Sequence, residues 1–245
     1  EVPAGQKLLI TGASGSGKST LIRLAAGLLQ RHGDGRVTGT VSVAGRDPAR
    51  LLPAECASTV GFVSQIPTDQ LIAGSISDEL AFGLESAGWP TARIEARIAE
   101  IWGRLGLGVA MERDPMTLSG GQAQRLVVGA TTAVGAPVLL LDEPLAQLDG
   151  DGVGALLLLL SELADSGVTV VVVEHRLAPM LPWADRVAVL DGGALVSVGE
   201  PSGITLPIRQ GRRRPPVVGA EIVAEVRDLR FSYGRTAVLG GIDLA

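Results

Sequence analysis

The stretch "GASGSGKST", from Gly12 to Thr20, decides the expected fold. Three glycines and a lysine followed by two hydroxyl residues fit the spacing G-x-x-x-x-G-K-[ST], between the apolar run "KLLIT" and the helix-like run "LIRLAAGLL". Glycines let backbone N–H groups curve around an anion, and the amino-terminal end of a helix carries partial positive charge. The stretch therefore predicts a phosphate-binding loop. A glycine-rich turn that contains Lys-Ser by chance is the alternative.

The roles expected of this loop follow from the chemistry of a nucleoside triphosphate. Lys18 would contact the β- and γ-phosphates of ATP, and Ser19 would offer its hydroxyl oxygen to Mg²⁺. The expected ligands are therefore ATP and Mg²⁺. The residues predicted to bind ATP are Gly12, Ala13, Ser14, Gly15, Ser16, Gly17, Lys18, Ser19 and Thr20.

Two adjacent acidic residues follow another apolar run, in "LLLDEP" from Leu139 to Pro144. Asp142 is expected to hold the Mg²⁺ through water, and Glu143 to polarise the water that attacks the γ-phosphate. Taken alone, the pair fits equally well a strand end that runs into a loop. Beside a phosphate-binding loop, the catalytic interpretation is favoured.

The remaining patterns predict an α/β fold. The runs "QKLLITG", "PVLLLDEP" and "GVTVVVVEH" are typical of strands that are covered on both faces of a parallel sheet. Between Thr91 and Leu105, apolar residues recur at helical spacing and predict an amphipathic helix. The segment 33–47, "GDGRVTGTVSVAGRD", alternates between apolar and polar residues and predicts antiparallel strands beside the main sheet.

Composition limits the possible partners. The 245 residues carry a formal net charge of −5, which argues against a broad cationic surface for nucleic acid. The longest apolar runs fall short of the roughly 20 residues that a membrane-spanning helix needs. Cys56 is the only cysteine, so no disulfide can form within the chain, which fits a reducing compartment.

A more restrictive motif is "LSGGQAQRL", from Leu118 to Leu126. It resembles the signature sequence of ATP-binding-cassette (ABC) ATPases. Gln65 in "VSQIP" resembles the Q-loop glutamine of that family, Asp149 in "LAQLD" resembles the D-loop aspartate, and His175 in "VVVEHR" resembles the switch histidine. The "EHR" triplet differs from the commoner threonine-histidine-aspartate version. A buried structural histidine is the alternative for His175.

The resemblance, which runs over about residues 2–201, implies a P-loop NTPase fold of the ABC-ATPase type. Such a fold has a mainly parallel sheet core, an antiparallel β-subdomain and a helical signature lobe. The family also implies two domains arranged head to tail, in which the signature of one domain covers the ATP of the other. The signature residues are Leu118, Ser119, Gly120, Gly121 and Gln122. The resemblance implies catalysis by Glu143, His175 and Gln65, a D-loop role for Asp149, and metal binding by Ser19, Gln65 and Asp142.

The end of the chain resembles the beginning of such a cassette. "LRFSYGRTAVLGGIDL" looks like its opening strands, with Tyr233 in the place of the aromatic residue that stacks on adenine. The expected organisation is an ABC domain over residues 1–200 that lacks its first strand and adenine-stacking loop, a Pro/Arg-rich linker over 201–220, and the opening strands of a second ABC domain over 221–245. There are three alternatives: a circularly permuted single domain, a tail that pairs back into its own domain and lends Tyr233 to this site, and a core position for Tyr233.

The stretch from Ser64 to Glu85, "SQIPTDQLIAGSISDELAFGLE", is similar to the ATPases of energy-coupling-factor (ECF) importers of vitamins or transition-metal ions. This similarity implies two partners, a transmembrane coupling protein and a small substrate-binding membrane subunit. It also implies a peripheral location on the cytoplasmic face of a bacterial cell membrane. Two other classes remain open: a soluble ABC ATPase that acts on nucleic acid or ribosomes, and a regulatory cassette that binds nucleotide without transport. The acidic charge speaks against the first, and the presence of Glu143, His175 and Gln65 against the second.

Overall fold

The computed structural model describes residues 1–29, 36–204, 226–233 and 236–244. The chain divides into two compact units, Glu1–Pro207 and Ile208–Ala245. Most of the predicted linker lies outside the described residues, because only the turn Pro201–Gly203 (η4) and Ile204 belong to the described part of it.

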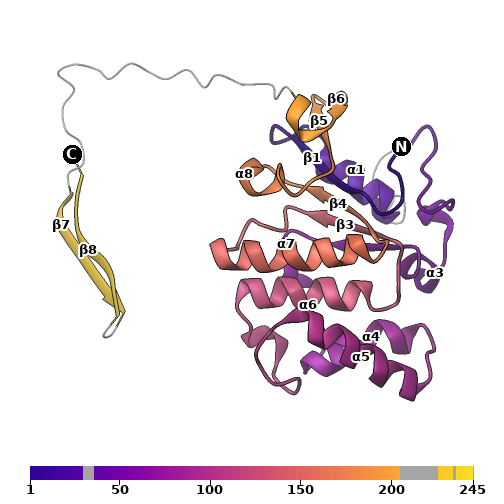
Figure 1. Cartoon of the computed structure of the whole chain (residues 1–245), viewed down its shortest axis with the longest axis horizontal. Coiled ribbons are helices and arrows are strands. Elements are labelled where there is room, and N and C mark those ends of the chain that lie inside the picture. Colours follow the sequence, from indigo (N-terminus) through magenta and orange to yellow (C-terminus); the bar gives the residue numbers. More distant parts are fainter. Residues whose placement is uncertain (30–35, 205–225, 234–235, 245) are drawn as a thin grey trace. The chain divides into compact units, whose positions relative to one another are not determined.

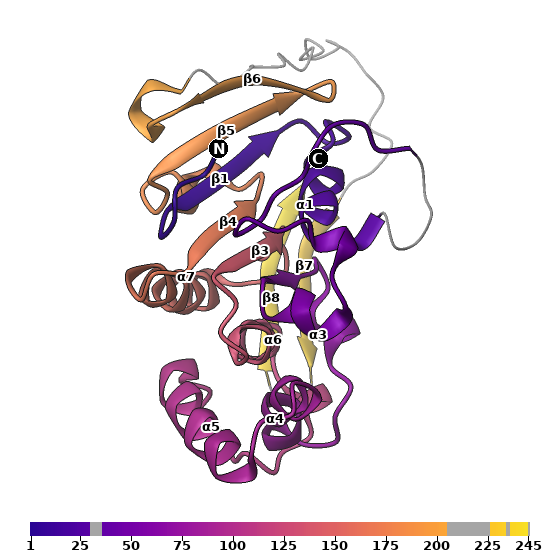
Figure 2. The same ribbon diagram turned by 90° about the vertical axis from the view of Figure 1, so that its right-hand side faces the viewer.

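The first unit is built on a six-stranded sheet in the order β2-β3-β4-β1-β5-β6. Figure 2 shows β3, β4, β1, β5 and β6 side by side in that order. Its first five strands in that order run parallel, and β6 runs antiparallel to β5. The three strands predicted from apolar runs are β1, β3 and β4, so the mainly parallel α/β class is confirmed. The strand bounds are Lys7–Gly12 (β1), Val60–Val63 (β2), Val138–Asp142 (β3), Thr169–Val173 (β4), Arg186–Asp191 (β5) and Ala194–Gly199 (β6).

Alternate residues of the central strands belong to two separate hydrophobic clusters, as expected when successive side chains point to opposite faces of a sheet. The helix α7 (Gly150–Asp165) contributes to one cluster and α1 (Lys18–Ala25) to the other, so both faces are covered. The larger cluster holds Leu9, Leu139, Leu141, Val170 and Val172, and the smaller one holds Leu8, Ile10, Leu140, Val171 and Val173.

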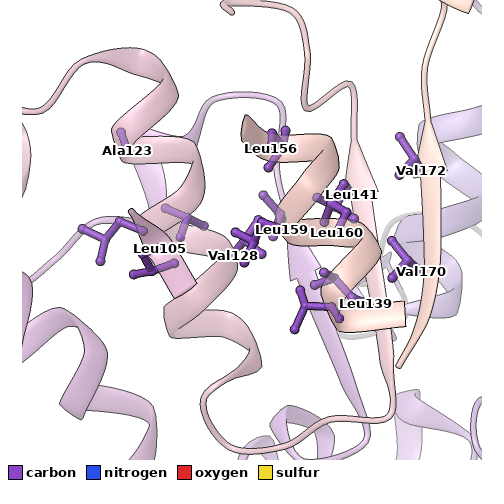
Figure 3. Packing of buried hydrophobic residues seen from close by; sticks show 14 of the residues in the cluster. Leu105, Ala123, Val128, Leu139, Leu141, Leu156, Leu159, Leu160, Val170 and Val172 are labelled. Atoms are coloured by element: carbon purple, nitrogen blue, oxygen red, sulfur yellow. The ribbon is translucent and has the colours of Figure 1, made fainter. Parts of the chain in front are cut away.

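A helical lobe packs on the outer side of α7. Figure 1 shows α6 (Gly120–Thr132) alongside α7, with α4 (Ile76–Ser86) and α5 (Thr91–Leu105) beyond it. The bounds of α5 agree with the sequence prediction. Its stripe of Ile94, Ile98, Ile101 and Leu105 is buried, because it joins the larger core cluster. The labelled side chains in Figure 3 connect this lobe through α6 and α7 to β3 and β4.

Short elements complete the first unit. Two are short α-helices, α3 (Pro53–Ala57) and α8 (Leu177–Met180). Three further 3₁₀ turns each begin with a proline, which fixes the backbone at the first helical position. Their bounds are Pro48–Arg50 (η1), Pro67–Gln70 (η2) and Pro115–Thr117 (η3).

The described part of the segment 33–47 does not form the antiparallel strands that its alternation predicts. Over its described residues, 36–47, the only strand-like pairing is a single antiparallel bridge between Val43 and Arg46. Isolated pairs of strands are marginally stable, and no neighbouring strand in the described part of the chain pairs with this segment. The antiparallel part of the main sheet is instead the β5–β6 pair.

The second unit contains an antiparallel hairpin of β7 (Val226–Tyr233) and β8 (Thr236–Leu244). Its backbone matches the prediction of two strands near the end of the chain. The side chain of Tyr233 lies outside the described residues, so its predicted stacking on adenine stays a prediction. Across the described residues, every helix is too short or too polar to cross a membrane.

Candidate nucleotide site

The glycine-rich loop leaves the carboxyl end of β1 and enters the amino-terminal end of α1. Gly12, Gly15 and Gly17 have φ angles of 144°, 76° and 96°, which side chains other than hydrogen disfavour. A Cβ atom on Gly12 would lie 1.9 Å from the carbonyl oxygen of Leu190 in β5. The first glycine is therefore required both by its own backbone and by the neighbouring strand.

Lys18 lies inside this loop. Its Nζ atom donates to the carbonyl oxygens of Gly12 at 2.9 Å and Ala13 at 3.0 Å, and the residue is 6% exposed. The Ser16 Oγ atom is also buried, and it has no hydrogen-bond partner among the residues that the structure describes. A cationic donor, an unpartnered hydroxyl and a curved glycine backbone form a cradle that suits phosphate oxygens.

The loop is joined to the end of β3 by Ser19 and Asp142. The Ser19 Oγ atom donates to Oδ1 of Asp142 over 2.8 Å. Arg23, one turn further along α1, places a guanidinium nitrogen 3.4 Å from Oδ2 of the same carboxylate. Asp142 is 2% exposed, so its carboxylate is shielded from water. The hydrogen bond from Ser19 keeps this carboxylate close to the loop. Arg23 was not singled out in the sequence, although its position one turn after Ser19 is the signal for it.

Glu143 lies at the centre of the predicted catalytic residues. Its Oε2 atom accepts a hydrogen bond from Nε2 of Gln65 over 3.0 Å and lies 3.7 Å from Nδ1 of His175. Its backbone N–H donates to the carbonyl of Val173 over 2.8 Å, and its φ angle is 48°. Gln65, Glu143 and His175 follow β2, β3 and β4, so three neighbouring strand ends bring them together.

Two residues beside His175 also make contacts with this site, and the sequence did not single them out. Glu174 is fully buried and accepts backbone hydrogen bonds from Leu145, His175 and Arg176. Arg176 donates to the carbonyl oxygens of Leu145 and Leu148. The departure of "EHR" from the commoner triplet was the only signal in the sequence for these contacts.

The signature residues begin α6. Ser119 caps this helix, because its Oγ atom accepts from the N–H of Gln122 over 3.3 Å while the Gln122 side chain accepts from the N–H of Ser119 over 3.0 Å. Gln122 also donates to the carbonyl of Leu107 over 2.8 Å. The start of α6 is thus fixed from both sides, while Leu118, immediately before it, packs against the larger core cluster.

A surface pocket of about 440 Å³ lies between the starts of α6 and α7. Asp149 lines it and also caps α7, because its Oδ1 atom accepts from the N–H of Gly152 over 2.8 Å. Arg125 lines the pocket as well, and burial lowers the pKa of its guanidinium below the ordinary value. The lining holds no phosphate-loop residue; it includes Ser119, Gly120, Gly121, Gln122, Gln147 and Asp151.

The structure therefore sorts the predicted residues into two places. The phosphate loop, Asp142, Glu143, Gln65 and His175 lie at the carboxyl ends of the parallel strands, where α/β proteins bind ligands. Ser119, Gly120, Gly121, Gln122 and Asp149 line a pocket at the starts of α6 and α7.

Comparison with known proteins identifies the family of this chain. Residues 1–146 match the ABC transporter family. A putative ABC transporter ATP-binding protein of Streptomyces coelicolor is 39% identical over 223 residues, which are 89% of this chain and 39% of that protein. Another, from Methanosarcina mazei, is 34% identical over 260 residues, which are 100% of this chain and 51% of that protein. The chain thus spans about two fifths to one half of these curated relatives.

Two solved structures share the fold. CbiO1 of Clostridium perfringens, described as part of the ABC transporter complex CbiONQ, has a TM-score of 0.74 at 27% identity, over 82% of this chain and 80% of that one. The ATP-binding cassette MJ0796, solved as a dimer bound to ADP and Pi, has a TM-score of 0.70 at 25% identity, over 83% of this chain and 89% of that one. The chain therefore belongs to the ABC transporter family and contains an ATPase domain of the ATP-binding-cassette type.

Proposed function

We propose that this chain binds and hydrolyses ATP to power a membrane transporter of the ECF type. The observation that carries the proposal is the contact of Gln65, Glu143 and His175 beside the phosphate loop. A carboxylate held between an amide and an imidazole is suited to orient and polarise a water molecule. In this arrangement Lys18 binds the β- and γ-phosphates, Glu143 takes a proton from the attacking water, and His175 contacts the γ-phosphate.

The residues also fit Mg²⁺. This ion prefers oxygen ligands and is bound in nucleotide enzymes by one or two protein groups together with phosphates. Ser19 and Asp142 offer two such oxygen atoms, 2.8 Å apart. Gln65, whose side-chain nitrogen donates to the neighbouring Glu143, would supply its side-chain carbonyl oxygen. When bound, Mg²⁺ would neutralise charge on the phosphates.

A second ABC domain is the proposed partner at the signature pocket. The amino-terminal end of α6 opens into this pocket at Ser119, Gly120 and Gly121, and no residue of the phosphate loop lines the pocket. Such an end favours anions. This supports a head-to-tail pair in which each signature contacts the ATP of the other domain, and MJ0796 was solved as a dimer.

The proposed contact with a membrane protein lies between β2, α4 and α6. A groove of about 240 Å³ there is lined by Phe62, Gln70, Phe82 and Val127, among others. Phe82 is 51% exposed, and Ile66 and Ile72 on the preceding segment are exposed as well. Glu79 holds this segment in place, because its carboxylate accepts from the N–H groups of Ile72 and Ala73 at 2.9 Å. Gln65 lies in sequence between Phe62 and Gln70, which both line the groove, so movement of a docked helix would be passed to Gln65 in the ATP site.

The ECF assignment rests on the stretch from Ser64 to Glu85 and on the likeness to CbiO1. It gives the chain a transmembrane coupling protein and a small substrate-binding membrane subunit as partners. It places the chain on the cytoplasmic face of the membrane.

The test is to tag the complete protein in its native cell, extract the membranes in mild detergent and identify the copurifying proteins by mass spectrometry. A transmembrane coupling protein with a small membrane subunit is expected, and the small subunit would identify the substrate. A nucleic-acid or ribosomal partner would instead support a soluble ABC ATPase. ATPase activity of the same preparation would separate both from a regulatory cassette.

A further inference from the structure

Glu174 is a buried carboxylate that the mechanism above does not use. It follows β4 directly and is 0% exposed. Its Oε1 atom accepts from the N–H groups of His175 at 2.8 Å and Arg176 at 3.0 Å, and its Oε2 atom accepts from the N–H of Leu145 at 3.2 Å. A buried charge is stable only when it is satisfied in this way. The carboxylate therefore ties the segment after β4 to the loop after β3.

Arg176 makes the reverse connection. Its Nη1 atom donates to the carbonyl of Leu145 over 2.6 Å and to the carbonyl of Leu148 over 3.2 Å. Both backbone polar groups of Leu145 are thus bound. Glu174 accepts from its N–H, and Arg176 donates to its carbonyl oxygen. Since Leu145 and Leu148 are themselves buried, this loop has little freedom to move separately from the segment after β4.

The two ends of the clamped loop carry groups of different sites. Glu143, two residues before Leu145, belongs to the phosphate-loop site. Asp149, directly after Leu148, lines the signature pocket. His175 lies between the two clamping residues in sequence, and its Nδ1 atom is 3.3 Å from Oε1 of Glu174.

We propose that Glu174 and Arg176 are positioning residues that hold Glu143, His175 and Asp149 as one rigid body. This clamp of Glu174 and Arg176 fixes where Glu143 and His175 lie relative to the phosphate loop, and it thereby sets the rate of the hydrolytic step. This inference rests on the ATP hydrolysis proposed above.

The test compares the complete protein with its Glu174→Gln and Arg176→Gln variants. Glu174→Gln keeps the size of the side chain but places an NH₂ group against a backbone N–H donor. Because small displacements of reacting groups are costly, we expect kcat to fall about tenfold or more, with KM for ATP changed less than about threefold. Arg176→Lys, which keeps one cationic donor, should recover part of the loss.

The matched control is Arg97→Gln. Arg97 also donates to two backbone carbonyls, those of Ala133 and Thr132, but it lies in α5, outside both sites. Arg97→Gln should lose about as much thermal stability as Arg176→Gln, and it should keep the kcat of the unmodified protein. Calorimetric ATP affinity and the thermal midpoint of unfolding are measured for every variant, so that misfolding is recognised. If Glu174→Gln fails to fold, Arg176→Gln still tests the clamp, because it alters a side chain that is partly exposed.

The double variant tests whether the two residues act as one. If they hold the same loop, its kcat should be close to that of the more severe single variant, because the second change removes nothing further. The clamp would be overturned if the losses in kcat of the two single variants multiplied in the double variant. It would also be overturned if the single variants kept their kcat as the Arg97→Gln control does. An unmodified protein that fails to hydrolyse ATP would contradict the proposed function instead.

Discussion

The side-chain amide of Gln65 donates to Oε2 of Glu143 over 3.0 Å, which joins the segment after β2 to the segment after β3. The groove proposed for the membrane partner is lined on this segment by Phe62 and Gln70, which lie on either side of Gln65 in sequence. The hydrogen bond therefore joins a segment that lines the groove to the proposed general base.

Replacing Glu143 by Gln should leave ATP binding intact and lower turnover by about 10²- to 10⁴-fold, the usual contribution of a general base. Calorimetry measures the first and phosphate release the second. Glu162→Gln, an exposed site on α7, is the control and should keep full activity. Normal turnover in Glu143→Gln would remove the general-base assignment.

Replacing Lys18 by Ala should weaken ATP binding, because a charged hydrogen-bond donor in the cradle is lost. Donors of this kind contribute about 1.5–3 kcal/mol, which corresponds to roughly 10- to 150-fold in affinity. The control is Lys7→Ala, since Lys7 pairs with Asp185 at the other end of β1. An affinity that stays the same by calorimetry in Lys18→Ala would contradict the loop geometry.

Replacing Gly12 by Ala should destabilise the domain by about 3 kcal/mol or more, because backbone strain and a collision with Leu190 add together. Gly15→Ala separates the two effects, since its φ angle is also positive but its Cβ atom would meet nothing within 4 Å. We expect about 1–2 kcal/mol there. Chemical denaturation measures both, and equal losses would contradict the collision.

Replacing Asp142 by Asn should raise the Mg²⁺ concentration required for half-maximal ATP turnover, because a neutral amide attracts the cation less strongly than a carboxylate. Removal of Mg²⁺ by a chelator should abolish turnover in the unmodified protein. Asp165→Asn, at the carboxyl end of α7, serves as the control and should leave the Mg²⁺ titration unchanged. An unchanged titration in Asp142→Asn would place the metal elsewhere.

Replacing Phe82 by Ser should release the chain from the proposed membrane partner and leave its own ATP affinity unchanged. Phe82 is a large exposed apolar residue in the proposed groove, and such residues are typical of protein interfaces. Leu158→Ser on α7 is the control, because Leu158 is also apolar and is 63% exposed, slightly more than Phe82. Copurification from detergent extracts gives the result; equal retention of both variants would exclude the groove as the docking site.

The sequence predicted the parts of the fold that depend on local pattern. The apolar runs became β1, β3 and β4, and the spacing of Ile94, Ile98 and Ile101 gave α5 with the predicted bounds. The alternation over 33–47 was a poorer guide, because a strand also needs a neighbour to accept its hydrogen bonds. Pattern alone cannot supply that neighbour.

In the candidate site, too, residues of a local motif could be predicted, whereas contacts with distant parts of the chain could not. Lys18, Ser19 and Asp142 could be found from motif and spacing, and they lie together. The collision at Gly12 could not, because it depends on Leu190 in a strand far along the chain. Glu174 and Arg176 were missed for the same reason: their partners lie in a loop about 30 residues earlier.

The left-handed backbone of Glu143 limits which residues can stand at this position, whatever chemistry they bring. At a φ angle of 48°, asparagine and aspartate are tolerated comparatively well, while β-branched residues are strongly disfavoured. In a saturation library at position 143, each variant must therefore meet two requirements: it must fold with this backbone conformation, and it must then be active. Variants that are inactive but abundant would identify the chemical requirement, and variants that are absent from the soluble fraction would identify the backbone requirement.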